Sequence, residues 1–108
     1  SFHDAETECV GYGGHLVSIH TAEMNDFVAH KAHSLGLTHG IHIGLMTTSF
    51  IYNENAWSDE SPYNYKNFAQ GFPLDVFGHC TAMETSASIG EWVSNNCESG
   101  HLPYACTR

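Results

Sequence analysis

Four cysteines constrain this chain more than any other feature of its sequence. They are Cys9, Cys80, Cys97 and Cys106, and none of them forms a Cys-x-x-Cys pair, which argues against a thioredoxin-type redox motif or a zinc knuckle. Two disulfides are the better interpretation, and four cysteines allow three pairings that the sequence cannot distinguish. Disulfides form in oxidising compartments, so we expect a secreted or extracellular protein.

The composition indicates one acidic globular domain. A chain of 108 residues is long enough for one core and too short for two, so we expect a single domain over residues 1–108. Three Lys and Arg stand against twelve Asp and Glu, giving a net charge of −9, which disfavours nucleic acid and anionic lipid as partners. No apolar run reaches the roughly 20 residues of a membrane span, so we expect no membrane insertion. The first residue is Ser1, which we interpret as the mark of a processed or trimmed product.

The first half of the sequence predicts two helices with a short strand at residues 15–19 between them. Phe2, Ala5, Cys9 and Tyr12 are three or four positions apart, as on one helix face, and Gly13-Gly14 ends the pattern. A second helix is predicted to begin at the N-cap Thr21, with Glu23 in its first turn, and to end before Gly36. We expect its buried stripe to be Met24, Phe27, Val28, the stem of Lys31, Ala32 and Leu35.

The second half predicts short strands and one long loop. Ile41, Ile43 and Leu45 alternate with other residues as in a strand, and residues 47–57 are typical of a hairpin with its turn at residues 53–55. Residues 58–78 follow no regular pattern, and a loop longer than about 15 residues in a compact domain is usually functional or mobile. Three short strands are expected at residues 80–84, 91–93 and 102–107.

These motifs, taken in order, resemble the C-type lectin-like domain. Gly14-His15-Leu16-Val17-Ser18-Ile19, with Glu23 and Phe27 after it, is similar to that family's Gly-Gly-x-Leu-x-Ser-Ile lead into its second helix. Ile43-Gly44-Leu45 is similar to its Trp-Ile-Gly-Leu core, with His42 in place of the tryptophan. The segment from Trp57 to Pro62, with Tyr65 and Phe68, is similar to its Trp-Ser-Asp-Gly-Ser-Pro stretch, and Gly90-Glu91-Trp92 precedes Cys97 as in the family. The resemblance covers residues 2–108.

The resemblance implies an α+β fold of the C-type lectin-like kind. In that fold two helices pack on short antiparallel sheets with a long loop, and the family's disulfides would here be Cys9–Cys106 and Cys80–Cys97. The chain departs from the family at its start, because it begins inside the first helix without the strand that usually precedes it. The segment around Tyr104 is therefore expected to lose a neighbour and to present an open edge.

A second departure concerns calcium. Family members that bind sugar through calcium carry oxygen ligands where this chain has Phe72-Pro73-Leu74, Gly78 and Val93-Ser94. Calcium needs about six to eight oxygen ligands, so we expect no calcium at the usual site and no other cofactor. Pro73 implies that the loop keeps its bend and the cis bond that the family often has there.

The resemblance implies a recognition domain that binds a glycan or an extracellular protein through the long loop. The sequence contains no nucleophile motif such as Gly-x-Ser-x-Gly, so we expect no enzyme. The candidate ligand-binding residues are Tyr63, Tyr65, Phe68, Phe72, Leu74, Asp75 and Phe77, because aromatic side chains supply rigid contact area. Phe68 and Phe72 could equally form a small core under the loop, whereas we expect Tyr63 to be exposed and Trp57 and Trp92 to lie in the main core.

Three other interpretations stay open. The chain could be a structural module that associates with copies of itself, favoured by an open edge and by low positive charge. Calcium could bind at a non-standard site built from Asp59, Glu60, Asp75 or Glu84. Nine histidines make the charge strongly dependent on pH, and the pairs His30 with His33 and His39 with His42 could contribute to a transition-metal site.

Overall fold

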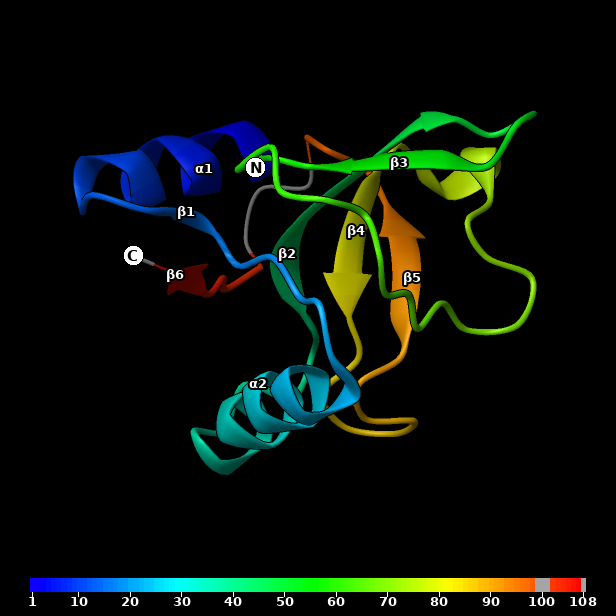
Figure 1. Ribbon diagram of the computed structural model, residues 1–108. Helices are drawn as coiled ribbons and strands as arrows, with labels where there is room; N and C mark the ends of the chain where they lie inside the picture. The colour runs from blue at the N-terminus through cyan, green and yellow to red at the C-terminus, as the bar shows by residue number, and fades with distance from the viewer. Residues whose placement is uncertain (99–101, 108) are drawn as a thin grey trace.

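The computed structural model describes residues 1–98 and 102–107, and its two helices lie at opposite ends of the strands (Figure 1). In chain order the elements are α1 (Phe2–Gly11), β1 (His15–Leu16), α2 (Ala22–Ser34), β2 (Ile41–Ser49), β3 (Glu54–Trp57), the 3-10 turn η1 (Asp75–Phe77), β4 (Cys80–Met83), β5 (Trp92–Asn95) and β6 (Cys106–Thr107). A four-stranded sheet has the order β3-β2-β4-β5, and β1 pairs with β6. All these pairings are antiparallel. The α+β class and its arrangement are confirmed.

Two disulfides close the fold with the pairing that the resemblance implies. Cys9 in α1 is bonded to Cys106 in β6, 97 residues away along the chain. Cys80, at the start of β4, is bonded to Cys97, just beyond β5. The first bond joins segments from the two ends of the chain. The second links β4 to the segment that follows the edge strand β5.

The first helix forms as its sequence pattern predicts. The Ser1 hydroxyl accepts the backbone N–H of Asp4 at 3.2 Å as an N-cap, and Phe2, Ala5 and Cys9 are buried. Tyr12 lies at the C-cap and is 62% exposed, so it does not continue the buried stripe. Neither α1 nor α2 is long and apolar enough to cross a membrane.

The second helix starts where predicted but buries a different face. Thr21 accepts the backbone N–H of Met24 at 3.1 Å, and Val28 and Ala32 are buried as expected. Phe27 and Leu35 were predicted to be buried, and this is wrong, because they are 64% and 63% exposed. The buried face instead contains Ala29 and the polar Asn25, whose side chain hydrogen-bonds to β5 and to Gly90.

The central strand β2 does not alternate between buried and exposed residues. Ile41, His42, Ile43, Gly44 and Leu45 are all buried, and Met46 is the first exposed residue. Both faces of β2 are covered, since α2 packs below the sheet and α1 with β1 lies at its other side (Figure 1). The hairpin turn also comes earlier than residues 53–55, because residues 50–53 form the turn and Glu54 already belongs to β3.

The core has two parts that meet at the sheet. The larger part lies between α2 and the four-stranded sheet and contains Trp57 and Trp92, which are 3% and 0% exposed as predicted. Their rings meet edge to face with centroids 5.6 Å apart. The smaller part lies under α1 and contains Phe2, Leu16 and the buried sulfur-bonded Cys9 and Cys80.

The C-terminal segment is paired at Tyr104, where an open edge was expected. Tyr104 forms an isolated parallel bridge with His42 of β2, and the His42 N–H donates to the Pro103 carbonyl at 2.8 Å. Further along, β6 (Cys106–Thr107) has β1 as its one strand neighbour in the described part of the chain. Tyr104 and β6 thus each have one strand neighbour among the described residues, and the open edge expected on the other side of this segment stays a prediction.

Candidate functional site

The long loop, residues 58–78, is fastened where it leaves β3. The Ser58 N–H donates to the Gly44 carbonyl of β2 at 2.8 Å, and its hydroxyl donates to the carboxylate of Glu6 in α1 at 2.9 Å. Asp59 accepts the Ser18 hydroxyl at 2.6 Å and both the backbone N–H and the hydroxyl of Ser61. The loop root is thus bonded to α1, to β2 and to the segment after β1.

These hydrogen bonds favour the ionised form of the two carboxylates at the loop root, Asp59 and Glu6. Burial by itself would raise the pKa of Asp59, but the hydrogen bonds from Ser18 and Ser61 favour the carboxylate and leave its pKa below the usual value. The same balance holds at Glu6, where burial is outweighed by hydrogen bonds from His15, the Leu16 N–H and Ser58, so its pKa is lowered. Both carboxylates are therefore ionised structural acceptors at neutral pH.

The first half of the loop packs on the core. Tyr65 and Phe68 meet the Trp92 ring edge to face at centroid distances of 5.8 and 5.5 Å, and the Ala69 N–H donates to the Trp92 carbonyl. Tyr63 was expected to be exposed, and this is wrong, because its hydroxyl oxygen is buried and it packs against the main core. Burial raises its pKa. Of these candidates, Phe68 belongs to the core under the loop.

The second half of the loop is the exposed one. The Phe72–Pro73 peptide is cis, and the half-buried Phe72 ring packs on Phe77 at 5.5 Å. Leu74 is 43% and Phe77 51% exposed, and Asp75 is exposed at the start of η1. Of the predicted ligand-binding residues, these are the ones that reach the surface.

Sequence reasoning missed three exposed apolar residues that belong to the same end of the molecule. Ile51 and Tyr52, in the β2–β3 turn, are 89% and 78% exposed, and Val76 in η1 is 76% exposed. The apolar turn Phe50-Ile51-Tyr52 was the signal that could have found them, since hairpin turns are usually polar. We name the set of Ile51, Tyr52, Leu74, Val76 and Phe77 the apical patch.

An aromatic contact and a hydrogen bond join the β2–β3 hairpin to His79, just after the long loop. The rings of Phe50 and His79 lie 4.8 Å apart, and the His79 ring nitrogen is 2.9 Å from the Thr47 carbonyl oxygen. Asn53 and the loop segment 66–72 line one cavity of about 370 Å³. In Figure 1 the turn and η1 both appear at the upper right of the fold, and the contact between Phe50 and His79 joins the turn to the residues just after η1. The apical patch is therefore contributed by two segments at one end of the molecule.

A second cavity lies next to the first along the loop. It has a volume of about 290 Å³ and is lined by Tyr63, Asn64, Tyr65 and Lys66. Lys66 lines both cavities, and the Asn64 side-chain oxygen is 2.8 Å from the His20 ring nitrogen. The hollowed part of the loop therefore offers both polar and aromatic groups, whereas the apical patch is apolar.

The residues at the family's usual calcium position do not fit a calcium ion. Phe72, Leu74, Gly78 and Val93 offer no side-chain oxygen, against the roughly six to eight oxygens that calcium needs. Ser94 is buried, and its hydroxyl accepts the Leu74 N–H at 2.9 Å. The serine thus serves to hold the loop on β5.

The other metal sites considered from sequence are not assembled. Within residues 1–98 and 102–107, no group of three or more His, Cys, Asp or Glu side chains could hold a metal ion. Asp59 has its oxygens engaged by serines, so the set of Asp59, Glu60, Asp75 and Glu84 does not form a shared site. His30 and His39 are exposed and His42 is buried, so these histidines do not point to one ion either.

Comparisons with known proteins agree with this geometry. The family model described as Lectin C-type domain matches residues 1–108. One relative is the secretory phospholipase A2 receptor of Mus musculus, which is 33% identical over all of this chain. The type-2 ice-structuring protein of Hemitripterus americanus is 30% identical over 90% of the chain. The snaclec GPIB-binding protein subunit alpha of Bothrops jararaca is 34% identical over 98% of it. The chain spans 7%, 56% and 75% of these relatives' own lengths.

Two solved structures extend the comparison. The cow C-type carbohydrate-recognition domain of CD23, crystallised in the presence of a GlcNAc2Man3 oligosaccharide, has a TM-score of 0.81 and 32% identity, covering 99% of this chain and 78% of its own. A calcium-independent type II antifreeze protein has a TM-score of 0.71 and 25% identity, covering 90% of this chain and 70% of its own. Relatives with this fold therefore include a carbohydrate-recognition domain and a protein that acts without calcium.

Proposed function

The chain belongs to the C-type lectin domain family, and from this membership we propose that it is an extracellular, non-catalytic recognition domain. Its ligand is a glycan or a protein, bound at the long-loop end without calcium at the family's usual site. The observation that carries the proposal is the division of the loop. Tyr65 and Phe68 are committed to the core, whereas the apical patch leaves large apolar side chains in solvent, and exposed apolar patches mark binding surfaces.

The polar groups next to the patch supply the directional contacts that a ligand needs. Lys66 lines both loop cavities, with Asn53 and Gln70 beside it in the larger one. A glycan would place its apolar ring faces on Tyr52 or Phe77 and its hydroxyls toward these groups. A protein ligand would use the same aromatic and aliphatic side chains as its buried contact.

The geometry near the loop root supports a non-catalytic role. Ser58, His15 and Glu6 lie together, but the Ser58 hydroxyl donates to the Glu6 carboxylate, and His15 contacts that same carboxylate through Nδ1. A serine nucleophile needs a histidine base that accepts its proton. The three side chains instead share one structural acceptor.

A glycan-array and serum-protein binding scan, run once with calcium and once with chelator, tests the proposal. We expect binding that survives chelator and is lost in the Ile51→Ser, Val76→Ser, Phe77→Ser variant. The matched control is Phe27→Ser, Leu35→Ser on α2, which removes apolar side chains that are just as exposed from the other end of the fold. Binding abolished by chelator, or binding unchanged in the apical variant, would contradict the proposal.

A second candidate is self-association through the groove between α2 and β6. The groove has a volume of about 200 Å³ and is lined by Phe27, Leu35, Tyr104 and the strand Cys106–Thr107 among others. A second copy would cover the apolar side chains and pair with the free side of β6. Light scattering across pH separates the two candidates, since a chain that stays monomeric at every pH contradicts this one. Here the roles of the two variants are exchanged, because only the Phe27→Ser, Leu35→Ser variant should prevent association.

A further inference from the structure

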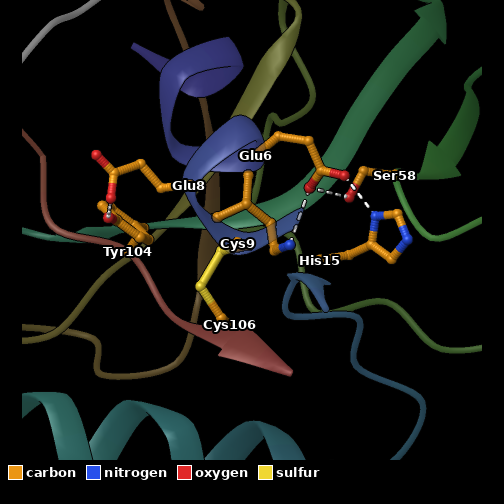
Figure 2. Close-up of a disulfide and its surroundings, with 8 residues drawn as sticks. Glu6, Glu8, Cys9, His15, Ser58, Tyr104 and Cys106 are labelled. Atoms are coloured by element: carbon orange, nitrogen blue, oxygen red, sulfur yellow. Dashed lines mark hydrogen bonds and ion pairs between the residues drawn. A yellow bond between two sulfur atoms is a disulfide. The ribbon is translucent and has the colours of Figure 1, made fainter. Parts of the chain in front are cut away.

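The carboxylate of Glu6 collects hydrogen bonds from three separate parts of the chain. Its Oε2 atom lies 2.5 Å from Nδ1 of His15, and its Oε1 atom accepts the Leu16 N–H and the Ser58 hydroxyl, both at 2.9 Å. Figure 2 shows these groups converging on Glu6 beside the Cys9–Cys106 disulfide. One side chain of α1 thus holds both β1 and the first residue of the long loop.

The charged groups that act on His15 all have the same sign. Glu6 faces it from α1, and Asp59 and Glu60 act on it from the loop root. On the remaining side, β6 presents Thr107, the register partner of His15, which does not titrate. The hydrogen bond to Glu6 raises the pKa of His15, against a smaller effect of burial, and the three carboxylates add to the rise. Among the described residues, the charged groups that act on His15 are thus carboxylates, and each of them favours a proton on this imidazole.

We propose that Glu6 and His15 form a pH-dependent latch, which holds the root of the long loop more tightly in mildly acidic than in alkaline solution. When His15 is protonated, the contact to Glu6 is an ion pair reinforced by a hydrogen bond. When the proton is lost, the neutral ring still donates from Nδ1, but the charge that balances the carboxylate is gone. Glu6 stays ionised and still accepts the Ser58 hydroxyl, but β1 holds the Glu6 side chain less firmly, so the attachment of the loop root through Glu6 weakens.

Three other histidines form hydrogen bonds through Nδ1, and their acceptors differ in charge from Glu6. Nδ1 of His20, His33 and His79 lies 2.7–2.9 Å from the Asn64 side-chain oxygen, the Thr85 carbonyl and the Thr47 carbonyl, respectively. These acceptors are neutral, and a ring in either charge state can donate to them from Nδ1. Of these four contacts, only the one between His15 and Glu6 joins an imidazole to a carboxylate.

The latch holds the root of the loop that carries the proposed binding surface. Only its effect on ligand binding rests on the proposed function. That consequence is a ligand affinity that falls as pH rises through the pKa of His15. The latch itself is a property of the free protein. It can therefore be tested without any ligand, and its failure is distinguishable from failure of the proposed function.

Amide hydrogen exchange read by NMR tests the latch directly. Protection factors, corrected for intrinsic exchange rates, are measured for the amides of Ser58, Glu60 and Ser61 at about pH 5.5 and about pH 8, on either side of an ordinary histidine pKa. The Glu84 amide, which donates to the Glu91 carbonyl, is the internal reference. Relative to it, we expect root protection to be about two- to fivefold higher in acid, the range of a partly exposed ion pair.

Three variants make the result specific. Glu6→Gln removes the carboxylate and should abolish the difference in protection and lower the His15 pKa in an imidazole titration. His15→Gln keeps a neutral donor and should also make root protection independent of pH, which preserves the test if the first variant does not fold. Glu8→Gln changes another α1 carboxylate, which accepts the Tyr104 hydroxyl, and should leave the difference intact. Equal wild-type protection at both pH values, or an undiminished difference in His15→Gln, overturns the proposal.

Discussion

The indole N–H of Trp92 donates a 2.8 Å hydrogen bond to the side-chain oxygen of Asn25, and both residues are buried. The Asn25 side-chain nitrogen in turn donates to the Gly90 carbonyl at 2.9 Å. A polar side chain on α2 therefore satisfies the buried indole of β5 and the backbone just before that strand. This pair explains why α2 turns Asn25 inward and leaves Phe27 in solvent.

Replacing Asn25 with alanine should destabilise the fold strongly. The indole N–H of Trp92 would stay buried without an acceptor, whereas the Gly90 carbonyl would keep its 2.7 Å bond from Asn67. We expect a loss of about 2–4 kcal/mol in the free energy of unfolding, measured by urea denaturation. Asp26→Ala, at the exposed neighbouring position, should stay within about 0.5 kcal/mol. A similar loss in both variants would contradict the role of the pair.

The two halves of the long loop should respond differently to alanine. Phe68 packs on Trp92, so Phe68→Ala should cost about 2–3 kcal/mol, below the range for a fully buried phenylalanine. Phe77 is 51% exposed, so Phe77→Ala should cost less than about 1 kcal/mol. Thermal unfolding of both variants checks this, and equal losses would mean that the loop is not divided as described.

Gly44 should not tolerate a methyl group. A Cβ atom there would lie 2.8 Å from the Leu16 carbonyl oxygen, 2.9 Å from the Ser58 hydroxyl and 3.1 Å from the Val17 carbonyl oxygen. Two of these atoms belong to the backbone, so Gly44→Ala should cost about 1–3 kcal/mol by overpacking. Gly11→Ala is the control, since a Cβ at Gly11 meets nothing within 4 Å. Equal stability of the two variants would show that β1 can move away from β2 at no cost.

Removing the disulfides should affect stability in the order of the loops that they close. In the chain-entropy account, a bond across 97 residues contributes about 4.7 kcal/mol and one across 17 residues about 3 kcal/mol. Urea denaturation of Cys9→Ala, Cys106→Ala and of Cys80→Ala, Cys97→Ala measures both. The reverse order would indicate that strain or residual structure in the unfolded chain dominates.

The contribution of Glu6 and His15 to stability should be largest in mildly acidic solution. The pKa of His15 is raised on folding, so its contribution is complete below the unfolded value and is lost as pH rises through the folded pKa. The pKa of Glu6 is lowered from 4.5, so its contribution is complete above that value and is lost as pH falls through the folded pKa. The difference in urea midpoint between wild type and His15→Gln should peak between these limits, and a difference independent of pH would refute the assignment.

Much of the fold follows from local signals in the sequence. Thr21 and Gly36 bound α2 as caps, with Gly36 at a φ of 81°, because capping depends on residues close along the chain. The stripe of α1 follows from spacing alone. The disulfide pairing depends instead on which distant segments meet, and only the resemblance to a known family supplied it.

The errors arise where tertiary partners override a local pattern. Phe27 has the right spacing for the buried face of α2, but the hydrogen bonds of Asn25 fix a different rotation of the helix. Tyr63 has a hydroxyl that favours water, yet its oxygen is buried and the side chain packs against the main core. The apical patch draws on segments some twenty residues apart in sequence, and the pattern of either segment alone does not reveal that Phe50 and His79 meet in the fold.

The bond between Cys9 and Cys106 also determines how the fold would respond to mechanical load. The bond closes the segment from Cys9 to Cys106. If the chain were pulled from points before Cys9 and after Cys106, the tension would pass through the disulfide and would not reach the sheet or the long loop. The hydrogen bonds of β2, β4 and β5 would then carry no load while the bond is intact. Reduction would direct the same force through the core, so the redox state of one covalent bond decides whether pulling can unfold the sheet and the long loop.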